Sequence, residues 1–273
     1  MTARNFKFGR KPRTFDSRIP KLTSARGIAL PVAVNYATGM PADLGMLLND
    51  TQGDCVEAAQ GHSIQVWTFN ASVGRNMVTP SDAQIEAAYE LEGGYVPGNP
   101  STDNGTVIQV ALVDWLSNAI DGNELAAFVE VDVNNMQAIK ESIFSCGFSL
   151  IGFNVPADID ENPGAIWDYD PNGDNSIIGG HCVICTGYQE NGNLNLITWG
   201  SANYQMTPAF WQHFVDEAYA LADTGWIQAT GNTPGGLTLA QLEALMQSMR
   251  APQVAPMRRH RHHRRVKRRA KSV

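Results

Sequence analysis

A cysteine and a histidine in distant parts of the chain have the surroundings that a thiol nucleophile requires. Cys55 follows Asp54, a good helix N-cap, and a helix is predicted from Cys55 to about Phe69. A thiol at a helix N-terminus gains thiolate character from the exposed N–H groups, and it becomes a strong nucleophile when a histidine takes its proton. The carboxylate of Asp54 acts in the opposite direction, because a negative neighbour raises a thiol pKa. Cys55 therefore needs a cationic partner.

Three histidines lie outside the C-terminal tail and could be that partner. His62 is seven residues from Cys55 on the same predicted helix, roughly 10 Å along its axis, which is too far for a hydrogen bond. His213 has no chemical pattern around it. His181 stands in the sequence GGHCV at 179–183, where two glycines allow another backbone to approach and a strand would hold the ring. His181 is therefore the best partner for Cys55.

The remaining patterns do not favour a metal site. Cys182 and Cys185 form a C-x-x-C motif, but no second pair stands at zinc spacing. The stretch 168–173 imitates the start of a calcium loop, yet position 12 would be Gly179 rather than glutamate. Without a secretion signal, four cysteines also argue against a disulfide framework. No metal or cofactor is predicted.

The elements that would position Cys55 and His181 change in character along the chain. The apolar periodicity and capping signals predict helices first and strands later, which indicates an α+β fold. A capping box of Ser81 and Gln84 opens the second helix, and an Asn-Gly turn at 191–192 predicts a hairpin. The predicted helices are 55–69, 81–91, 106–119, 136–144, 208–221 and 238–249; the predicted strands are 126–131, 148–155, 180–188, 194–199 and 225–229.

Charge divides the chain into an acidic body and two basic arms. Residues 1–26 hold eight Lys and Arg against one acid, residues 27–249 hold only Arg75 and Lys140 against 26 acids, and residues 250–273 hold ten Lys and Arg. Such blocks bind an anionic partner or fold back on an oppositely charged surface. We expect a basic N-terminal arm at 1–26, one folded domain at 27–234, a C-terminal helix at 235–250 and a basic disordered tail at 251–273.

Composition and apolar runs limit the class of protein. A chain of 273 residues with 43% hydrophobic content can bury a sizeable core. No apolar run reaches about 18 residues, and the charged stretch 1–15 lacks the apolar core of a signal peptide. A cytoplasmic protein without a membrane span is expected.

The order of the motifs resembles that of the papain-like cysteine peptidases. Residues 49–55 read NDTQGDC and open a helix, 179–183 read GGHCV before Gly187-Tyr188, and 197–200 read ITWG. In that family a helix-borne cysteine comes first, a GHAV strand brings the histidine, and an NSWG strand supplies an asparagine that orients it. The resemblance covers roughly residues 40–230, and it extends to uncharacterised phage and bacterial proteins. It implies that a helical N-terminal half, carrying the nucleophile helix, packs on a C-terminal antiparallel sheet.

The position of the nucleophile can be aligned with the family in two ways. Aligning Gln52-Gly53 with the family's QG would place Ala58 at the nucleophile, whereas aligning Cys55 itself places Asn49 at the oxyanion-stabilising glutamine. The second alignment keeps the nucleophile at the helix start. It also lets the Asn49 amide and the backbone N–H of Cys55 hold a developing oxyanion.

The orienting asparagine of the family is missing. Ile197 or Thr198 occupies its place, so Thr198, Asn195 or another residue would have to hold the imidazole. A hydroxyl or amide orients a ring more weakly than a carboxylate does, which predicts reduced activity. Trp199 keeps the position of the ring that shields the histidine, although it could equally be a core residue.

Together these residues imply a thiol hydrolase that cleaves peptide or amide bonds through a Cys–His acyl-enzyme. The predicted catalytic residues are Cys55, His181, Asn49 and Thr198, and the predicted substrate-binding residues are Gln52, Gly180 and Trp199. The partner would be a peptide or protein substrate, favoured when cationic because an acidic loop at 156–175 is expected beside the cleft. The alternative is a weak or inactive phage structural or packaging-associated protein, virion-associated, whose basic arms bind nucleic acid.

Nucleic-acid binding by the tail would depend on phosphate contacts, because the tail lacks aromatic residues. A solvated tail and docking on the acidic body are the other interpretations. The candidate contacts are Arg258, Arg259, Arg261, Arg264, Arg265, Lys267, Arg268 and Arg269.

Overall fold

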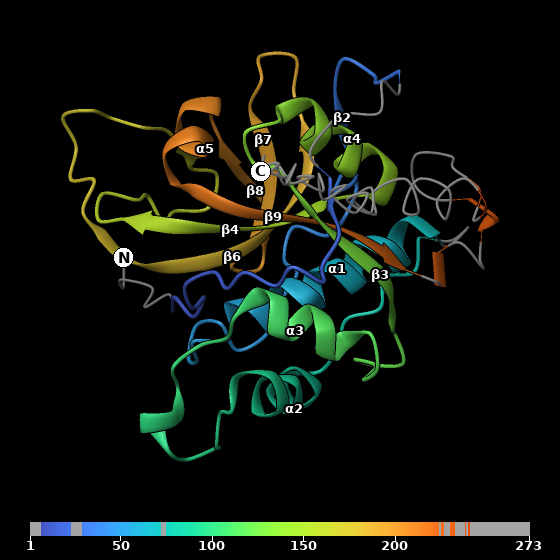
Figure 1. Ribbon diagram of the computed structural model, residues 1–273, viewed down its shortest axis with the longest axis vertical. Coiled ribbons are helices and arrows are strands. Elements are labelled where there is room, and N and C mark those ends of the chain that lie inside the picture. Colours follow the sequence, from blue (N-terminus) through green and yellow to red (C-terminus); the bar gives the residue numbers. More distant parts are fainter. Residues whose placement is uncertain are drawn as a thin grey trace, which may run out of the picture.

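The computed structural model describes residues 7–22, 29–71, 75–223, 225–226, 230–232, 238 and 240. Within them, helices of the first half pack beneath a sheet formed mainly by the second half (Figure 1). The predicted C-terminal helix at 235–250, apart from residues 238 and 240, and the basic tail lie outside the described residues. No helix of the described ranges has the length and hydropathy that crossing a bilayer would require.

Four of the predicted helices, at 55–69, 81–91, 106–119 and 136–144, are found with their ends shifted by up to four residues. The α-helices are α1 Cys55–Ala71, α2 Asp82–Gly93, α3 Ile108–Trp115, α4 Met136–Cys146 and α5 Pro208–Phe214, with a 3-10 turn at Pro100–Thr102. The capping box of Ser81 and Gln84 opens α2 as predicted. At the end of α4, Gly147 takes a left-handed conformation with φ of 89°, which a residue without a Cβ adopts at little cost.

The described strands form one nine-stranded sheet in the order β1-β3-β9-β4-β6-β7-β8-β5, with β2 beside β6. Their bounds are β1 Lys21–Leu22, β2 Val34–Asn35, β3 Leu125–Val131, β4 Ser149–Pro156, β5 Ile166–Trp167, β6 Ile177–Tyr188, β7 Leu194–Thr198, β8 Ser201–Met206 and β9 Val215–Asp223. The predicted hairpin joins β6 to β7, and Gly192 in its turn has φ of 91°.

The predicted helix 208–221 is wrong beyond Phe214. Residues 215–223 form β9, which lies between β3 and β4 and pairs antiparallel with both. Nearly all of its side chains are buried, so its apolar run does not alternate. Such a run can belong to a buried strand or a buried helix, and here pairing with two neighbouring strands decides the structure. Strand β8 was also not predicted. The predicted strand 225–229 is wrong at residues 225–226, which are helical, and its residues 227–229 lie outside the described residues.

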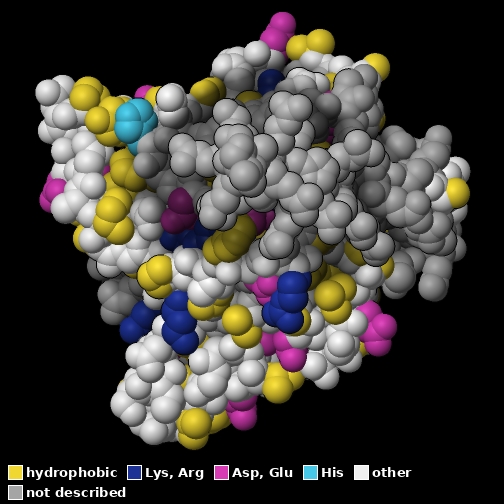
Figure 2. All heavy atoms as spheres, viewed as in Figure 1, with side chains coloured by type: hydrophobic (Ala, Val, Ile, Leu, Met, Phe, Trp, Pro, Cys, Tyr) yellow, Lys and Arg dark blue, Asp and Glu magenta, His cyan; other side chains and the backbone are white. Residues whose placement is uncertain are grey.

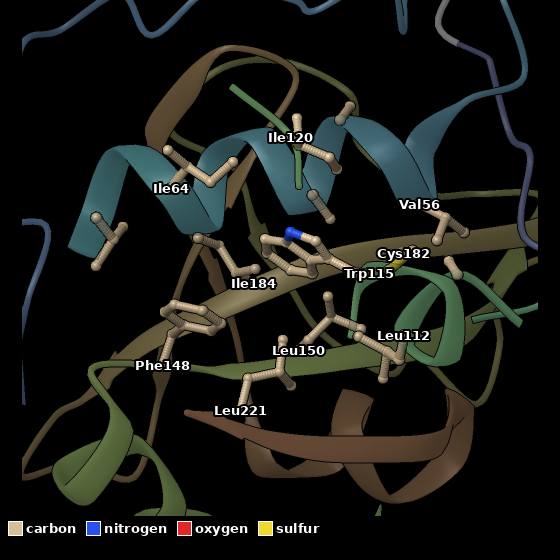
Figure 3. Close-up of a cluster of buried hydrophobic side chains, with 14 of the residues drawn as sticks. Val56, Ile64, Leu112, Trp115, Ile120, Phe148, Leu150, Cys182, Ile184 and Leu221 are labelled. Atoms are coloured by element: carbon tan, nitrogen blue, oxygen red, sulfur yellow. The ribbon is translucent and has the colours of Figure 1, made fainter. Parts of the chain in front are cut away.

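Two apolar cores cover the two faces of the sheet. One lies toward α1, α2 and α3, and the other lies toward α4 and α5. Figure 3 shows the first core, where side chains of α1, α3, β4, β6 and β9 meet; its labelled members are Val56, Ile64, Leu112, Trp115, Ile120, Phe148, Leu150, Cys182, Ile184 and Leu221. Because side chains alternate along β6, Cys182 faces this core and His181 faces the other side of the strand.

Candidate active site

Cys55 is the first residue of α1 and its thiol is almost fully buried. The backbone N–H of Gly9 donates to Sγ at 3.3 Å, and the backbone of Cys182, the residue after His181, also hydrogen-bonds the thiol. Burial nevertheless raises the pKa of Cys55 to about 12. In this arrangement the thiol is therefore protonated at neutral pH.

His181 is held from β6 with one ring nitrogen engaged. Its Nε2 lies 2.7 Å from the hydroxyl of Thr198, the last residue of β7. Its buried Nδ1 makes no hydrogen bond to any described residue, Cys55 included. Burial and, to a smaller extent, the nearby guanidinium of Arg10 lower the pKa of His181 to about 3. The ring is therefore neutral, and Nδ1 is the nitrogen left to accept a proton.

Aromatic rings enclose the imidazole. Trp199 stacks on His181 with ring centroids 4.7 Å apart, and Phe153 and Phe8 approach edge-on at 5.7 and 5.8 Å. Trp199 has φ of 46°, a left-handed conformation that is uncommon for a bulky residue. Strained backbone of this kind persists where the surrounding contacts hold it, and here it places the indole over the histidine.

The two candidate oxyanion side chains point to different neighbours. The amide of Asn49 donates to the carbonyl of Lys7 at 3.3 Å and to the carboxylate of Asp54 at 3.2 Å. The amide of Gln52 instead donates to Glu86 of α2 at 2.9 Å. The structure thus brings Asn49 against a peptide carbonyl near Cys55 and ties Gln52 to the helical half.

Residues 7–13, which we call the N-terminal segment, lie across the site in extended form. The N–H of Arg10 donates to the carbonyl of Gly180 at 3.0 Å, on the sheet side. On the helical side, Thr106 donates to the carbonyl of Gly9 at 2.7 Å and accepts from the N–H of Lys11 at 2.9 Å. Figure 1 shows this segment passing between β6 and α3, and Figure 2 shows Lys and Arg side chains along the same band.

Glycines allow the N-terminal segment to pass so close. A Cβ on Gly9 would collide with the carbonyl of Gly53, and a Cβ on Gly105 would collide with the carbonyl of Gly9. The segment covers the thiol and the imidazole together, and the burial that makes both groups neutral includes this cover. The structure therefore shows a site filled by the N-terminal segment, with Cys55 as the neutral thiol and His181 as the neutral imidazole.

Some residues of the site were not singled out from the sequence. Arg10 reaches Asp216 and Glu217 of β9, and Thr106 binds both the segment and the buried carboxylate of Glu57. The basic composition of 1–26 beside an acidic body was the available signal for the first contact. The acids that contact Arg10, Asp216 and Glu217, belong to β9. That the acidic loop 156–175 flanks the cleft stays a prediction.

Of the remaining site predictions, those in the basic tail fall outside what the structure describes. The eight candidate nucleic-acid contacts of the tail lie beyond residue 240 and are outside the described residues. Gly180 and Trp199 lie at the site, as the Arg10 and His181 contacts above show.

Comparison with solved structures identifies the fold. The cysteine protease xylellain from Xylella fastidiosa superposes with a TM-score of 0.61 at 15% identity, covering 80% of this chain and 97% of that one. Procathepsin B from Trypanosoma congolense gives 0.58 at 12% identity, covering 80% and 86%. Digestive procathepsin L2 from Tenebrio molitor larval midgut gives 0.56 at 14% identity, covering 80% and 79%.

The chain therefore has the papain-like fold of these cysteine proteases, as the order of its motifs predicted. No family model matches the sequence, and no curated protein sequence matches it.

Proposed function

We propose that this protein is a thiol hydrolase that cleaves peptide or amide bonds, with Cys55 as nucleophile and His181 as general base. The observation that carries the proposal is the state of His181. Its Nε2 is held by Thr198, its Nδ1 has no hydrogen-bond partner among the described residues, and the backbone of the next residue, Cys182, hydrogen-bonds the thiol of Cys55 at the start of α1. A ring held at one nitrogen keeps the other aimed at its proton donor.

The reaction begins when the N-terminal segment leaves the site. Sγ then exchanges the N–H of Gly9 for Nδ1 of His181, which takes the thiol proton as sulfur attacks the carbonyl carbon of the substrate. The imidazolium returns that proton to the leaving amine, and a thioester remains on Cys55. Water, deprotonated at Nδ1, then attacks the thioester carbonyl; the carbon–sulfur bond breaks, the acid leaves, and the imidazolium returns the proton to Sγ.

Three groups support these steps. Nε2–H donates to the hydroxyl of Thr198, which fixes the tautomer and the ring. The amide of Asn49, which donates to the peptide carbonyl of Lys7, would donate with the N–H of Cys55 to the developing oxyanion. Trp199 keeps water from the outer face of the imidazole.

Trapping the acyl-enzyme tests this proposal. The full-length protein and its Gly9→Val variant, in which a side chain would expel the segment, are mixed with a library of fluorogenic peptide amides. After acid quenching, peptide mass spectrometry locates any acyl group. We expect acyl-Cys55 and turnover in Gly9→Val, and neither in Gly9→Val combined with Cys55→Ala.

Cys146→Ala is the matched control, because this buried thiol lies at the end of α4, away from the site. It should leave acylation unchanged. Turnover that persists without Cys55, or a Gly9→Val variant whose thiol is accessible but never acylated, would overturn the proposal.

A further inference from the structure

The side chain of Arg10 occupies an acidic slot in the sheet half of the site, with Glu217 buried and Asp216 37% exposed. The Arg10 side chain is 1% exposed, although arginine is among the residues least often buried. Its Nη1 lies 2.6 Å from Asp216 Oδ1 and 2.6 Å from Glu217 Oε1, and its Nη2 lies 2.9 Å from Asn154 Oδ1 and 3.2 Å from Asp216 Oδ2. The slot thus binds both ends of the guanidinium fork.

The walls of the slot are shaped for this side chain. A Cβ on Gly152 of β4 would lie 2.7 Å from Arg10 Cδ, and a Cβ on Gly180 of β6 would lie 3.0 Å from Arg10 Nε. The hydroxyl of Tyr219 donates to Glu217 Oε2 at 2.8 Å and holds that carboxylate in place. Two glycines therefore leave the room that the arginine stem fills.

The body of the protein has no other cation to neutralise these acids. Between residues 27 and 249 the sequence holds only Arg75 and Lys140. Arg75 lies over the ring of Phe69 and Lys140 over that of Tyr188, on other parts of the molecule. When the segment leaves, two carboxylates remain without a counterion, so a cation from outside is favoured.

Along the N-terminal segment, the residue that fills the slot, Arg10, directly follows the residue that contacts the thiol, Gly9. The N–H of Gly9 contacts Sγ of Cys55, and the N–H of the next residue, Arg10, binds the carbonyl of Gly180 beside His181. An extended peptide that fills the site in this way places an arginine in the slot and, one residue before it, the N–H that contacts the thiol. The N-terminal segment is such a peptide.

From these contacts we infer that Asp216, Glu217 and Asn154 form an arginine-selective subsite, and that the substrates are peptides with an arginine beside a small residue. The inference rests on the proposed hydrolase and names its substrate class. The N-terminal segment then acts as an internal ligand of that subsite. Lysine fits less well, because a single ammonium cannot bridge two carboxylates and an amide in the plane of a fork.

Equilibrium peptide binding tests the subsite without requiring turnover. Fluorescein-labelled peptides with the sequence of residues 6–13, FKFGRKPR, are titrated against the full-length Gly9→Val protein and followed by anisotropy. We expect the peptide carrying the Arg10→Lys change to bind about tenfold more weakly, and those with Arg10→Gln or Arg10→Glu more weakly still. Wild-type protein, whose slot is filled, should bind none of them.

Substitutions in the protein show whether the slot causes the preference. Asp216→Asn and Glu217→Gln should reduce the difference between the Arg and Gln peptides, whereas Glu190→Gln, at an exposed acid of the β6–β7 hairpin, should leave it unchanged. We call a variant whose N-terminal segment has left the site an opened protein. If Gly9→Val does not fold, as judged by circular dichroism, Arg10→Gln serves as the opened protein, because it removes the buried charge that holds the segment.

The outcomes separate the two proposals. Equal binding of the Arg and Gln peptides, or no peptide binding by an opened protein whose Cys55 reacts with iodoacetamide, would overturn the subsite. Arginine-selective binding without any acyl-Cys55 would contradict the hydrolase and leave the subsite standing. Arginine-selective binding with hydrolysis beside the same arginine supports both.

Discussion

The neutral state of Cys55 and His181 is a property of two residues and of what covers them. With the thiol pKa raised to about 12 and the imidazole pKa lowered to about 3, proton transfer from sulfur to Nδ1 is strongly unfavourable in the occupied site. Both shifts arise mainly from burial. Readmitting water therefore moves both pKa values toward the range in which an ion pair can form.

This state predicts the pH dependence of thiol alkylation. Cys55 in the wild-type protein should react with iodoacetamide slowly, and faster only as the pH rises above about 9. In Gly9→Val the reaction should be fast near pH 6 to 7, and His181→Ala in that background should abolish the fast phase. Peptide mass spectrometry measures labelling at Cys55, with Cys185 as an internal buried reference. Fast labelling of the wild-type thiol at pH 6 would show that the segment does not cover it.

Thr198 and Asn195 were both candidates for orienting the imidazole, and substitutions of each distinguish between them. Thr198→Val removes the partner of Nε2 and should lower kcat/KM of the opened protein about tenfold or more, while Thr198→Asn retains most activity. Asn195→Ala is the control, because Asn195 lies near the start of β7, in register with Gln205 of β8, whereas Thr198 ends the strand. A loss on Asn195→Ala equal to that on Thr198→Val would contradict the assignment.

At the scale of elements, α1 and α2 meet through two buried carboxyl groups. Burial raises the pKa of Glu57 to about 7 and that of Glu92 well above its usual range, and the two side chains hydrogen-bond each other. Glu57 also accepts from the hydroxyl of Thr106 at 2.5 Å. The folded protein therefore holds protons that the unfolded chain releases near pH 4.5.

The sign of the resulting pH dependence follows from proton linkage. Because the folded state binds more protons between about pH 4.5 and 7, Glu57 lowers the free energy of unfolding as the pH rises through this range, and Glu92 acts in the same direction. Glu92→Gln keeps a hydrogen-bond donor to Glu57 but removes one titrating group. The free energy of unfolding should therefore fall less steeply with pH and be higher at pH 8 than in the wild-type protein. Urea unfolding between pH 5 and 8 measures this, and Glu90→Gln, on the exposed face of α2, should leave the slope unchanged.

The elements show which parts of the fold could be predicted. The start of α1 at Cys55 and the β6–β7 hairpin were predicted because caps and turns are local signals. Strand β9 was missed because its buried run has no period that distinguishes a strand from a helix. Its identity depends on pairing with β3 and β4, which no short stretch of sequence contains.

The candidate site divides in the same way. Cys55, His181 and Thr198 could be named because each stands in a motif with its own spacing. The arginine slot could not, because Arg10 meets its partners Asp216 and Glu217 more than 200 residues later in the chain. The charge blocks indicated only that a basic arm could fold back on an acidic body.

At the scale of the whole molecule, the basic tail at 251–273 supports a prediction from sequence alone. If the tail binds nucleic acid through phosphates, truncation after Pro256 should remove most affinity for single-stranded DNA, and the affinity of the intact protein should fall steeply with salt. Electrophoretic mobility shifts at 50 and about 200 mM salt measure this. Equal affinity of the intact and truncated proteins would favour a tail that serves solubility or docks on the body.

The long sequence separation between Arg10 and β9 also has a consequence for biosynthesis. Arg10 is translated long before Glu217, which stands 207 residues later. The contacts that close the site therefore belong to the slow, non-local class and form only after almost the whole domain has left the ribosome. Until then the nascent chain carries an uncovered cysteine, so oxidation or alkylation damage to Cys55 should be concentrated in newly made molecules and rare in mature ones.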